Sequence, residues 1–364
     1  MSRRPSPSAA LVAALVIGLP LASCDQGDDP GARPMTSSPS AAQEEYLGLS
    51  VEPLAGVEDL DVPFPGLPAV GERADRVWLG APDGLEWLDL DDAEAHVVDR
   101  IPGTYLGLVG DDTLYRAGFQ AQTIAKYDVS GEPREVARGR VRWPLGVAAS
   151  RDVLWLTDHG RSRLLRLDPD TLAVTRRIHI GTQGPGDVDG AAGLAWVGDH
   201  LWVVSKWDAS LYEVDGHTGD IMRVVPLGAE DMANPLVLTS AGLWAWVGDR
   251  TDDGVAFHSL VLVDPERGEV TARLRLREPD DIEGDQVAMV CAPFEVDGEI
   301  WAPVDDYLVH LNPDQDWAPD RVLSLPDGTA VLSDVVAGDH LWYYSPLPSP
   351  HDARVPLDEL VAPS

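Results

Sequence analysis

The stretch Asp152–Gly181 reads DVLWLTDHGRSRLLRLDPDTLAVTRRIHIG, and it decides the fold. Three short runs in it are rich in aliphatic, aromatic or β-branched residues: Val153–Thr157, Arg163–Leu167 and Ala173–Ile180. Two clusters of turn-forming residues separate these runs, Asp158-His159-Gly160 and Asp168-Pro169-Asp170. Runs of this length between such clusters predict antiparallel strands joined by tight turns. The stretch is therefore predicted to be a small β-meander.

The same arrangement recurs along the chain. An apolar residue followed by a large aromatic residue occurs seven times, with the aromatic at Trp78, Tyr115, Trp155, Trp202, Trp244, Trp301 and Trp342. The interval between successive aromatics varies, whereas in the first four copies an Asp follows the aromatic at an unchanging distance along the chain, at Asp91, Asp128, Asp168 and Asp215. A constant spacing within copies and a variable spacing between them indicate one structural module with variable loops. Repeats of about 40 residues with several strands each predict a β-propeller.

Each repeat divides into four strands, as the fourth copy shows. We expect its innermost to outermost strands at Gly193–Val197, Leu201–Lys206, Ser210–Asp215 and Ile221–Leu227. Glycine and Asp in the intervening segments favour tight turns. The aromatic on the second strand is predicted to pack between adjacent blades, because burying a Trp stabilises a fold by about 4–6 kcal/mol.

The seventh copy contains too few strands after its aromatic. Val331–Ala337 and His340–Tyr344 supply two strands, and Arg354–Leu357 supplies a third. An open ring would leave sheet edges unpaired, so we expect Tyr46–Leu54 to form the outermost strand of the last blade. The predicted fold is all-β: a seven-bladed β-propeller of four-stranded antiparallel blades over residues 46–364, closed by an N-terminal strand.

The N-terminus has the features of a targeting segment. Arg3 and Arg4 precede the apolar run Ala9–Leu19, which is too short to span a bilayer as a helix. Leu21-Ala22-Ser23-Cys24 follows it and resembles a bacterial lipobox, which implies a signal peptide over residues 1–23 and a lipid on Cys24. An ordinary secretory signal is the alternative. Residues 24–45 are polar and small, so we expect a flexible tether to a membrane on its extracytoplasmic side.

The charge balance excludes some partners. The chain has 27 basic and 61 acidic residues, a formal charge of −34, whereas nucleic acid binding needs Lys and Arg for its phosphates. Only two cysteines are present. With Cys24 lipidated, Cys291 has no partner within the chain, and its apolar surroundings in the sequence predict burial. We expect a monomer that binds no nucleic acid.

The repeats resemble a known family. Leu201–Asp215, closing on Val224–Gly228, is similar to the YVTN-type propeller repeat, and Ile178–Gly181 has the same ending. Trp155-Leu156-Thr157-Asp158 also resembles the repeated motif of streptogramin B lyase propellers, with Asp158 in place of a Glu. The resemblance covers about residues 75–345. It implies a propeller, and the lyase likeness implies a His and a Mg²⁺ site in the central channel.

The turns after the second strands and the loops that connect successive blades gather on one face of a propeller, so their residues are our candidate site. The possible catalytic residues are Asp158, His159 and Arg161, with His159 as a general base oriented by a carboxylate. The ligand-binding candidates are Asp83, Gln120, Lys206, Trp207, Asp208, Asp249, Arg250, Asp305 and Asp306, and the metal-binding candidates are Asp187 and Asp189. Acidic loops suit Ca²⁺ or Mg²⁺, although plain solvated turns would have the same composition.

The sequence predicts a binding or scaffolding module for a protein partner or a small ligand. The alternative is a metal-assisted lyase or hydrolase with its site in the central channel. Two long insertions, Asp249–Phe257 and Arg277–Ala292, fall on the candidate face, and extended loops on a rigid scaffold are where recognition usually resides.

Overall fold

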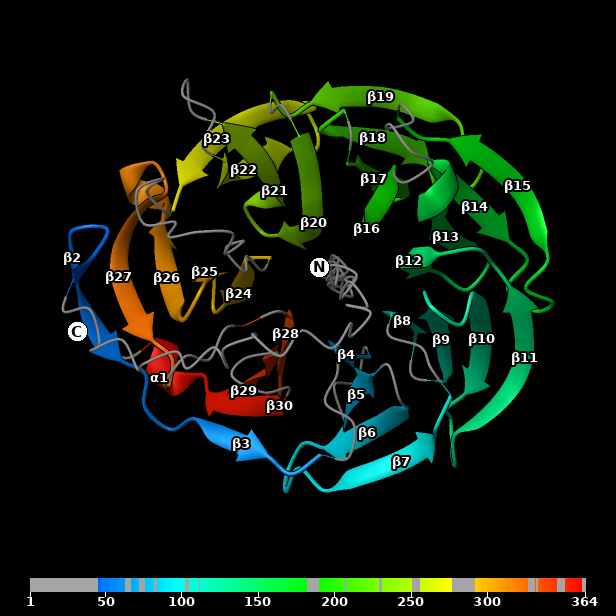
Figure 1. Cartoon of the computed structure of the whole chain (residues 1–364), viewed down its shortest axis with the longest axis horizontal. Helices are drawn as coiled ribbons and strands as arrows, with labels where there is room; N and C mark the ends of the chain where they lie inside the picture. Colours follow the sequence, from blue (N-terminus) through cyan, green and yellow to red (C-terminus); the bar gives the residue numbers. More distant parts are fainter. Residues whose placement is uncertain are drawn as a thin grey trace, which may run out of the picture.

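A computed structural model of the chain shows strands arranged in a ring around a central axis (Figure 1). The structure describes residues 45–62, 67–71, 76–81, 84–101, 105–110, 112–181, 190–206, 208–228, 231–250, 256–276, 292–326, 331, 333–345 and 351–361. These residues form seven sheets, which we number as blades 1 to 7 along the chain. The predicted seven-bladed, all-β propeller is therefore confirmed.

The first four blades each contain four antiparallel strands. Blade 1 consists of β4 (Leu67–Val70), β5 (Arg76–Gly80), β6 (Leu85–Asp89) and β7 (Ala95–Asp99). Blade 2 consists of β8 (Tyr105–Val109), β9 (Thr113–Gly118), β10 (Thr123–Asp128) and β11 (Arg134–Arg140). Blade 3 consists of β12 (Pro144–Ala149), β13 (Leu154–Asp158), β14 (Arg163–Leu167) and β15 (Val174–His179). Blade 4 consists of β16 (Ala191–Val197), β17 (His200–Ser205), β18 (Ser210–Asp215) and β19 (Ile221–Pro226).

Of the last three blades, blades 6 and 7 include the N-terminal strands. Blade 5 consists of β20 (Asp231–Thr239), β21 (Gly242–Arg250), β22 (Ala256–Asp264) and β23 (Glu269–Arg275). Blade 6 contains β24 (Phe294–Val296), β25 (Glu299–Val304), β26 (Tyr307–Asn312) and β27 (Ala318–Ser324), to which β2 (Leu49–Pro53) and β1 (Glu45–Tyr46) are added. Blade 7 consists of β28 (Ser333–Ala337), β29 (His340–Ser345), β30 (His351–Pro356) and β3 (Glu58–Leu60). A short helix α1 (Asp358–Val361) follows β30, and 3₁₀ turns η1 (His159–Arg161) and η3 (Pro313–Gln315) follow β13 and β26.

Blades 1 to 5 run from the centre outward in chain order, so β12 and β16 line the centre while β15 and β19 form the rim (Figure 1). In blades 6 and 7 the outermost strands come instead from the N-terminal segment. The turns that join second to third strands therefore share one face, which we call the upper face; it includes the segments 158–163 and 205–210. The turns that join third to fourth strands share the lower face, which includes the segments 168–173 and 215–220. The seven strands that were predicted in the third and fourth repeats lie within two residues of their predicted positions, whereas β12 was not predicted.

The repeated aromatic is a core residue, as predicted. Trp78, Trp155, Trp202, Trp244, Trp301 and Trp342 are each at most 2 % exposed. Trp155 also connects two blades, because its Nε1 donates a 2.9 Å hydrogen bond to the carbonyl oxygen of Gly216 in blade 4. The wedge between blades thus combines apolar burial with a satisfied indole N–H.

The repeated Asp stabilises the lower-face turns. The Asp168 Oδ1 accepts hydrogen bonds from the Thr171 and Asp170 backbone N–H groups at 2.7 and 3.1 Å. Asp215 does the same for Thr218 and His217 at 2.6 and 3.0 Å. These side-chain caps hold the tight turn to the outermost strand. The constant spacing between the aromatic and the Asp is therefore structural.

The prediction for Tyr46–Leu54 is wrong. The strand in this segment, β2, pairs in parallel with β27 at the edge of blade 6, and the fourth strand of blade 7 is β3, which pairs with β30. An ion pair accompanies each placement: Arg321 bonds Glu52 at 3.1 Å, and Arg354 bonds Glu58 at 2.8 Å. The N-terminal segment therefore runs along the outer edges of two neighbouring blades (Figure 1).

Across the part of the chain that the structure describes, no helix has both the length and the apolar character that a membrane span requires.

Candidate functional site

Asp158 ends β13 at the upper face and lies in an unusual environment. It is 3 % exposed, and its nearest basic partner is the Arg161 guanidinium, 3.9 Å from Oδ2. Burial raises the pKa of the Asp158 carboxyl, while four arginines, Arg161, Arg163, Arg142 and Arg177, act in the opposite direction. The carboxylate is thus partly desolvated and is influenced by the positive charges of four arginines.

His159 begins η1 and is 7 % exposed. Burial and the positive charge of Lys206 lower its pKa to about 4, although a backbone hydrogen bond with Ala191 opposes this. The imidazole is therefore neutral near pH 7. The groups that set its pKa are burial, Lys206 and a main-chain group, and the Asp158 carboxyl is not among them. A neutral, weakly basic imidazole of this kind suits hydrogen bonding better than proton abstraction at pH 7.

An aromatic residue outside the repeat pattern lies against this turn. The Trp143 ring covers Gly160 so closely that a Cβ there would lie 2.1 Å from the ring, and the Trp143 carbonyl accepts a 3.2 Å hydrogen bond from the His159 N–H. Phe119 of blade 2 stacks on Trp143 with ring centroids 6.2 Å apart. The Arg142 guanidinium lies 4.7 Å from the Trp143 ring centroid, within cation–π range. Blades 2 and 3 are thereby joined at the upper face.

Several buried polar atoms on this face have unused hydrogen-bonding capacity. They are Thr157 Oγ1, Asp158 Oδ1, Ser205 Oγ and Asp208 Oδ1, none of which has a hydrogen-bond partner in the described structure. Thr157 and Ser205 are fully buried. Buried polar groups are normally satisfied, so four such atoms at the ends of β13 and β17 distinguish this region from the satisfied caps of the lower face.

Lys206 and Asp208 form the corresponding turn of blade 4. Lys206 is 9 % exposed, and its backbone N–H donates a 2.9 Å hydrogen bond to the Gly190 carbonyl. The second oxygen of Asp208, Oδ2, accepts a 2.9 Å hydrogen bond from the Tyr212 hydroxyl. The structure therefore brings five predicted candidates, Asp158, His159, Arg161, Lys206 and Asp208, to the adjoining upper-face turns of blades 3 and 4.

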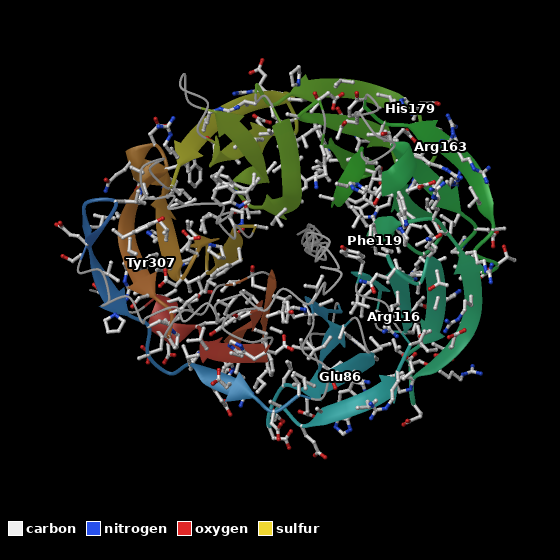
Figure 2. The ribbon with its side chains drawn as sticks, viewed as in Figure 1. Glu86, Arg116, Phe119, Arg163, His179 and Tyr307 are labelled. Atoms are coloured by element: carbon white, nitrogen blue, oxygen red, sulfur yellow. The ribbon has the colours of Figure 1, made fainter. Side chains whose placement is uncertain are left out.

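The other predicted ligand-binding candidates that the structure describes lie outside the turns of blades 3 and 4. Gln120 is exposed on the upper-face turn of blade 2, next to Phe119. Asp305 and Asp306 lie on the blade 6 turn beside Tyr307, which is across the ring from blade 3 (Figure 2); Tyr307 stacks on Tyr46 at 4.4 Å.

The fifth repeat differs from its predicted form. Asp249 and Arg250 belong to β21, where they pair with Phe257 and Ala256 of β22. The extra residues of this repeat thus partly lengthen a hairpin. The following predicted positions lie outside the described residues: Cys24, Asp83, Asp187, Asp189, Trp207, Cys291 and residues 277–291 of the second insertion.

Within the described ranges, no group of three or more His, Cys, Asp or Glu side chains is arranged to hold a metal ion. The residues that sequence reasoning missed are Phe119, Trp143, Thr157 and Ser205. A signal for Trp143 does exist in the sequence, since it is an aromatic that falls outside the second-strand position of its repeat.

Comparison with known proteins identifies the fold. No protein-family model matches the chain, and no curated protein sequence matches it. Among solved structures, BamB from Moraxella catarrhalis superposes with a TM-score of 0.55 at 16% identity, covering 84% of this chain and 100% of that one. U3-55K superposes with a TM-score of 0.64 at 14% identity over 84% and 100%. A catalytically inactive virginiamycin B lyase from Staphylococcus aureus, solved with quinupristin, gives 0.58 at 13% over 82% and 98%. At these identities the likeness shows the fold alone.

Proposed function

We propose that this protein is an exported, lipid-anchored β-propeller that acts as a binding or scaffolding module, and that it contacts its partner through the upper face of blades 2 to 4. The observation that carries the proposal is the concentration of buried, unsatisfied polar atoms at the ends of β13 and β17. A buried polar atom that lacks a protein partner needs a water molecule, an ion or a ligand group to satisfy it, and turns on a scaffold are where ligands commonly bind.

The surrounding residues support a contact surface. Trp143 is half-buried and Arg142 and Arg161 are exposed, and Trp and Arg are the residues most enriched where binding energy concentrates. The structural neighbours share the fold, and one propeller fold hosts many functions. The proposal therefore rests on the side chains of this face.

Site-specific photocrosslinking tests the upper face. A photoreactive phenylalanine analogue replaces Gln120, which is exposed on the upper face of blade 2, or His217, which is exposed on the lower face of blade 4. Irradiation of native membranes should give a discrete adduct from position 120 and none from position 217. Adducts of equal yield from both positions, or none from position 120, would contradict the proposal.

The lipid anchor is tested separately. Cys24→Ala should prevent incorporation of labelled fatty acid and release the chain from the membrane fraction, whereas Cys291→Ala should change neither. Persistent lipid labelling of the Cys24→Ala chain would exclude Cys24 as the anchor. The metal-assisted lyase or hydrolase alternative predicts a stoichiometric divalent ion in the purified chain, which elemental analysis detects.

A further inference from the structure

Positive charge is concentrated in one part of this acidic chain. Residues Arg134–His179 contain 10 basic and 5 acidic residues, a balance of +5. The whole chain has 27 basic and 61 acidic residues, so the remainder has 17 and 56, a balance of −39. The positive segment comprises β11 and all of blade 3.

Asp158, Arg163 and His179 of blade 3 form a row. The register pairs Asp158 with Arg163 and Arg163 with His179 across β13, β14 and β15. Residues directly opposite each other across a sheet project from the same face, so this row lies on one face at the upper end of the blade. Arg177 is two residues from His179 and shares that face. Figure 2 shows Arg163 and His179 on the outer half of blade 3, with Phe119 nearer the centre of the ring.

Within the described residues, the arginines near this row lack counter-charges at ion-pair distance. In the described structure, Arg142, Arg163 and Arg177 have no carboxylate within salt-bridge distance, and Arg161 has only Asp158 at 3.9 Å. Several other arginines are paired with carboxylates, as Arg176 is with Asp220 at 2.7 Å. The unmatched guanidiniums therefore have donors available for an external anion.

The scaffold does not require these charges. At the positions that correspond to Asp158, Arg163 and His179, blade 4 has Ser205, Ser210 and Pro226. Arg177 corresponds to Val224. Edge strands often carry charges that prevent unwanted pairing, but Arg163 is on the third strand and has no free edge to protect. Blade 4 has the same topology without charged residues at these positions, so the arginines of blade 3 are not needed for folding and are available for binding.

We infer that the upper end of blade 3, formed by Arg142, Arg161, Arg163 and Arg177 around Asp158, is a docking surface for an extended, carboxylate-rich segment of a protein partner. This inference rests on the proposed function and names the chemistry of its partner. The row alone crosses two gaps between strands, about 10 Å, so a single small anion reaches only part of it. Aspartate or glutamate side chains at alternate positions of an extended segment recur about every 7 Å and reach several guanidiniums together.

A narrow acidic segment fits better than an anionic membrane. A bilayer is a broad surface that would also face the rest of the protein, whose balance is −39, and like charges would oppose adsorption. A single peptide segment contacts the positive surface alone. Trp143 and Phe119 border it on the channel side and supply apolar contact area.

The test is a titration of the full-length chain in detergent with a fluorescent peptide of alternating glutamate and serine. The control peptide has glutamine in place of glutamate. The wild type should bind the glutamate peptide, and its affinity for this peptide should fall as the ionic strength rises above about 0.1 M. Its affinity for the glutamine peptide should be at least about tenfold lower.

Matched variants locate the contact. The double variant Arg163→Gln/Arg177→Gln should weaken binding of the glutamate peptide by about tenfold or more. The control Arg176→Gln/Arg223→Gln removes the same charge from arginines that are paired with Asp220 and Glu213, and should bind within about twofold of wild type. Equal weakening in both variants would show an effect of net charge only and overturn the inference. So would equal binding of the two peptides, or tighter binding of anionic phospholipid vesicles.

The two proposals fail in distinguishable ways. If a partner crosslinks from position 120 but the glutamate peptide does not bind, the inference of an acidic segment is wrong and the proposal of a binding module stands. If position 120 gives no adduct but the glutamate peptide still binds, the proposal of a partner in native membranes is wrong and the inference of a carboxylate-binding surface stands.

Discussion

Asp168 and Asp215 lie at the lower-face turns of blades 3 and 4, whereas Asp158 and Asp208 lie at the upper face of the same two blades. Hydrogen bonds from backbone N–H groups lower the pKa of the Asp168 and Asp215 carboxyls. Asp158 is buried with a raised pKa, and Asp158 and Asp208 each keep an oxygen without a hydrogen-bond partner in the described structure. Aspartate therefore caps turns on the lower face, whereas on the upper face its carboxylate keeps an oxygen without a hydrogen-bond partner in the described structure. The lower-face turns carry the Asp that the repeats share, whereas the upper-face turns carry residues that differ from repeat to repeat.

The largest expected difference is between two tryptophans of blade 3. Trp155→Ala should lower the free energy of unfolding by about 3–5 kcal/mol, because it removes a fully buried ring between blades. Trp143→Ala, at the half-buried upper-face position, should cost about 1 kcal/mol. Urea denaturation of both variants measures this. A cost for Trp143→Ala as large as that for Trp155→Ala would make Trp143 part of the core.

His159 should make the protein sensitive to acid. Its folded pKa of about 4 is below the unfolded value of 6.5, so the unfolded state binds more protons between these values. Stability is therefore lost as pH falls from 6.5 to 4, by on the order of 3 kcal/mol. His159→Gln should flatten the dependence of unfolding free energy on pH in this window. The control His217→Gln, at an exposed lower-face turn, should leave the wild-type slope, and an unchanged slope in His159→Gln would refute the burial argument.

Two Asp→Asn changes should shift stability in opposite directions. The folded pKa of Asp215 is lowered, so its contribution is present above the unfolded pKa and is lost as pH falls through the folded value; Asp215→Asn should lower the melting temperature at pH 7. The folded pKa of Asp158 is raised, so its ionisation opposes folding at pH 7, and Asp158→Asn should raise the melting temperature there. Thermal denaturation at pH 7 decides. Shifts of the same sign would remove the distinction between the two faces.

The repeat made most of the fold predictable. Seven of the eight strands of blades 3 and 4, all except β12, were predictable to within two residues because apolar runs and turn residues alternate at a constant spacing. The position of β2 was not, because its parallel pairing with β27 joins segments near opposite ends of the chain and has no local signature. Asp158, His159 and Lys206 stood out because their repeats differ there. The burial of Asp158 was not predictable, because it depends on neighbours from other blades, and neither was the contact between Phe119 and Trp143.

The smallest expected effect separates a satisfied hydroxyl from an unsatisfied one. Thr239 Oγ1 accepts a 3.0 Å hydrogen bond from Trp244 Nε1, so Thr239→Val should leave the buried indole N–H unmatched and cost about 1–3 kcal/mol. Ser205 Oγ is also buried, but it has no hydrogen-bond partner in the described structure, so Ser205→Ala should change the free energy of unfolding by less than about 0.5 kcal/mol. Chemical denaturation compares the two. If Ser205→Ala costs as much as Thr239→Val, the Ser205 hydroxyl already has a structural partner, and the unused capacity proposed for the upper face is reduced by one group.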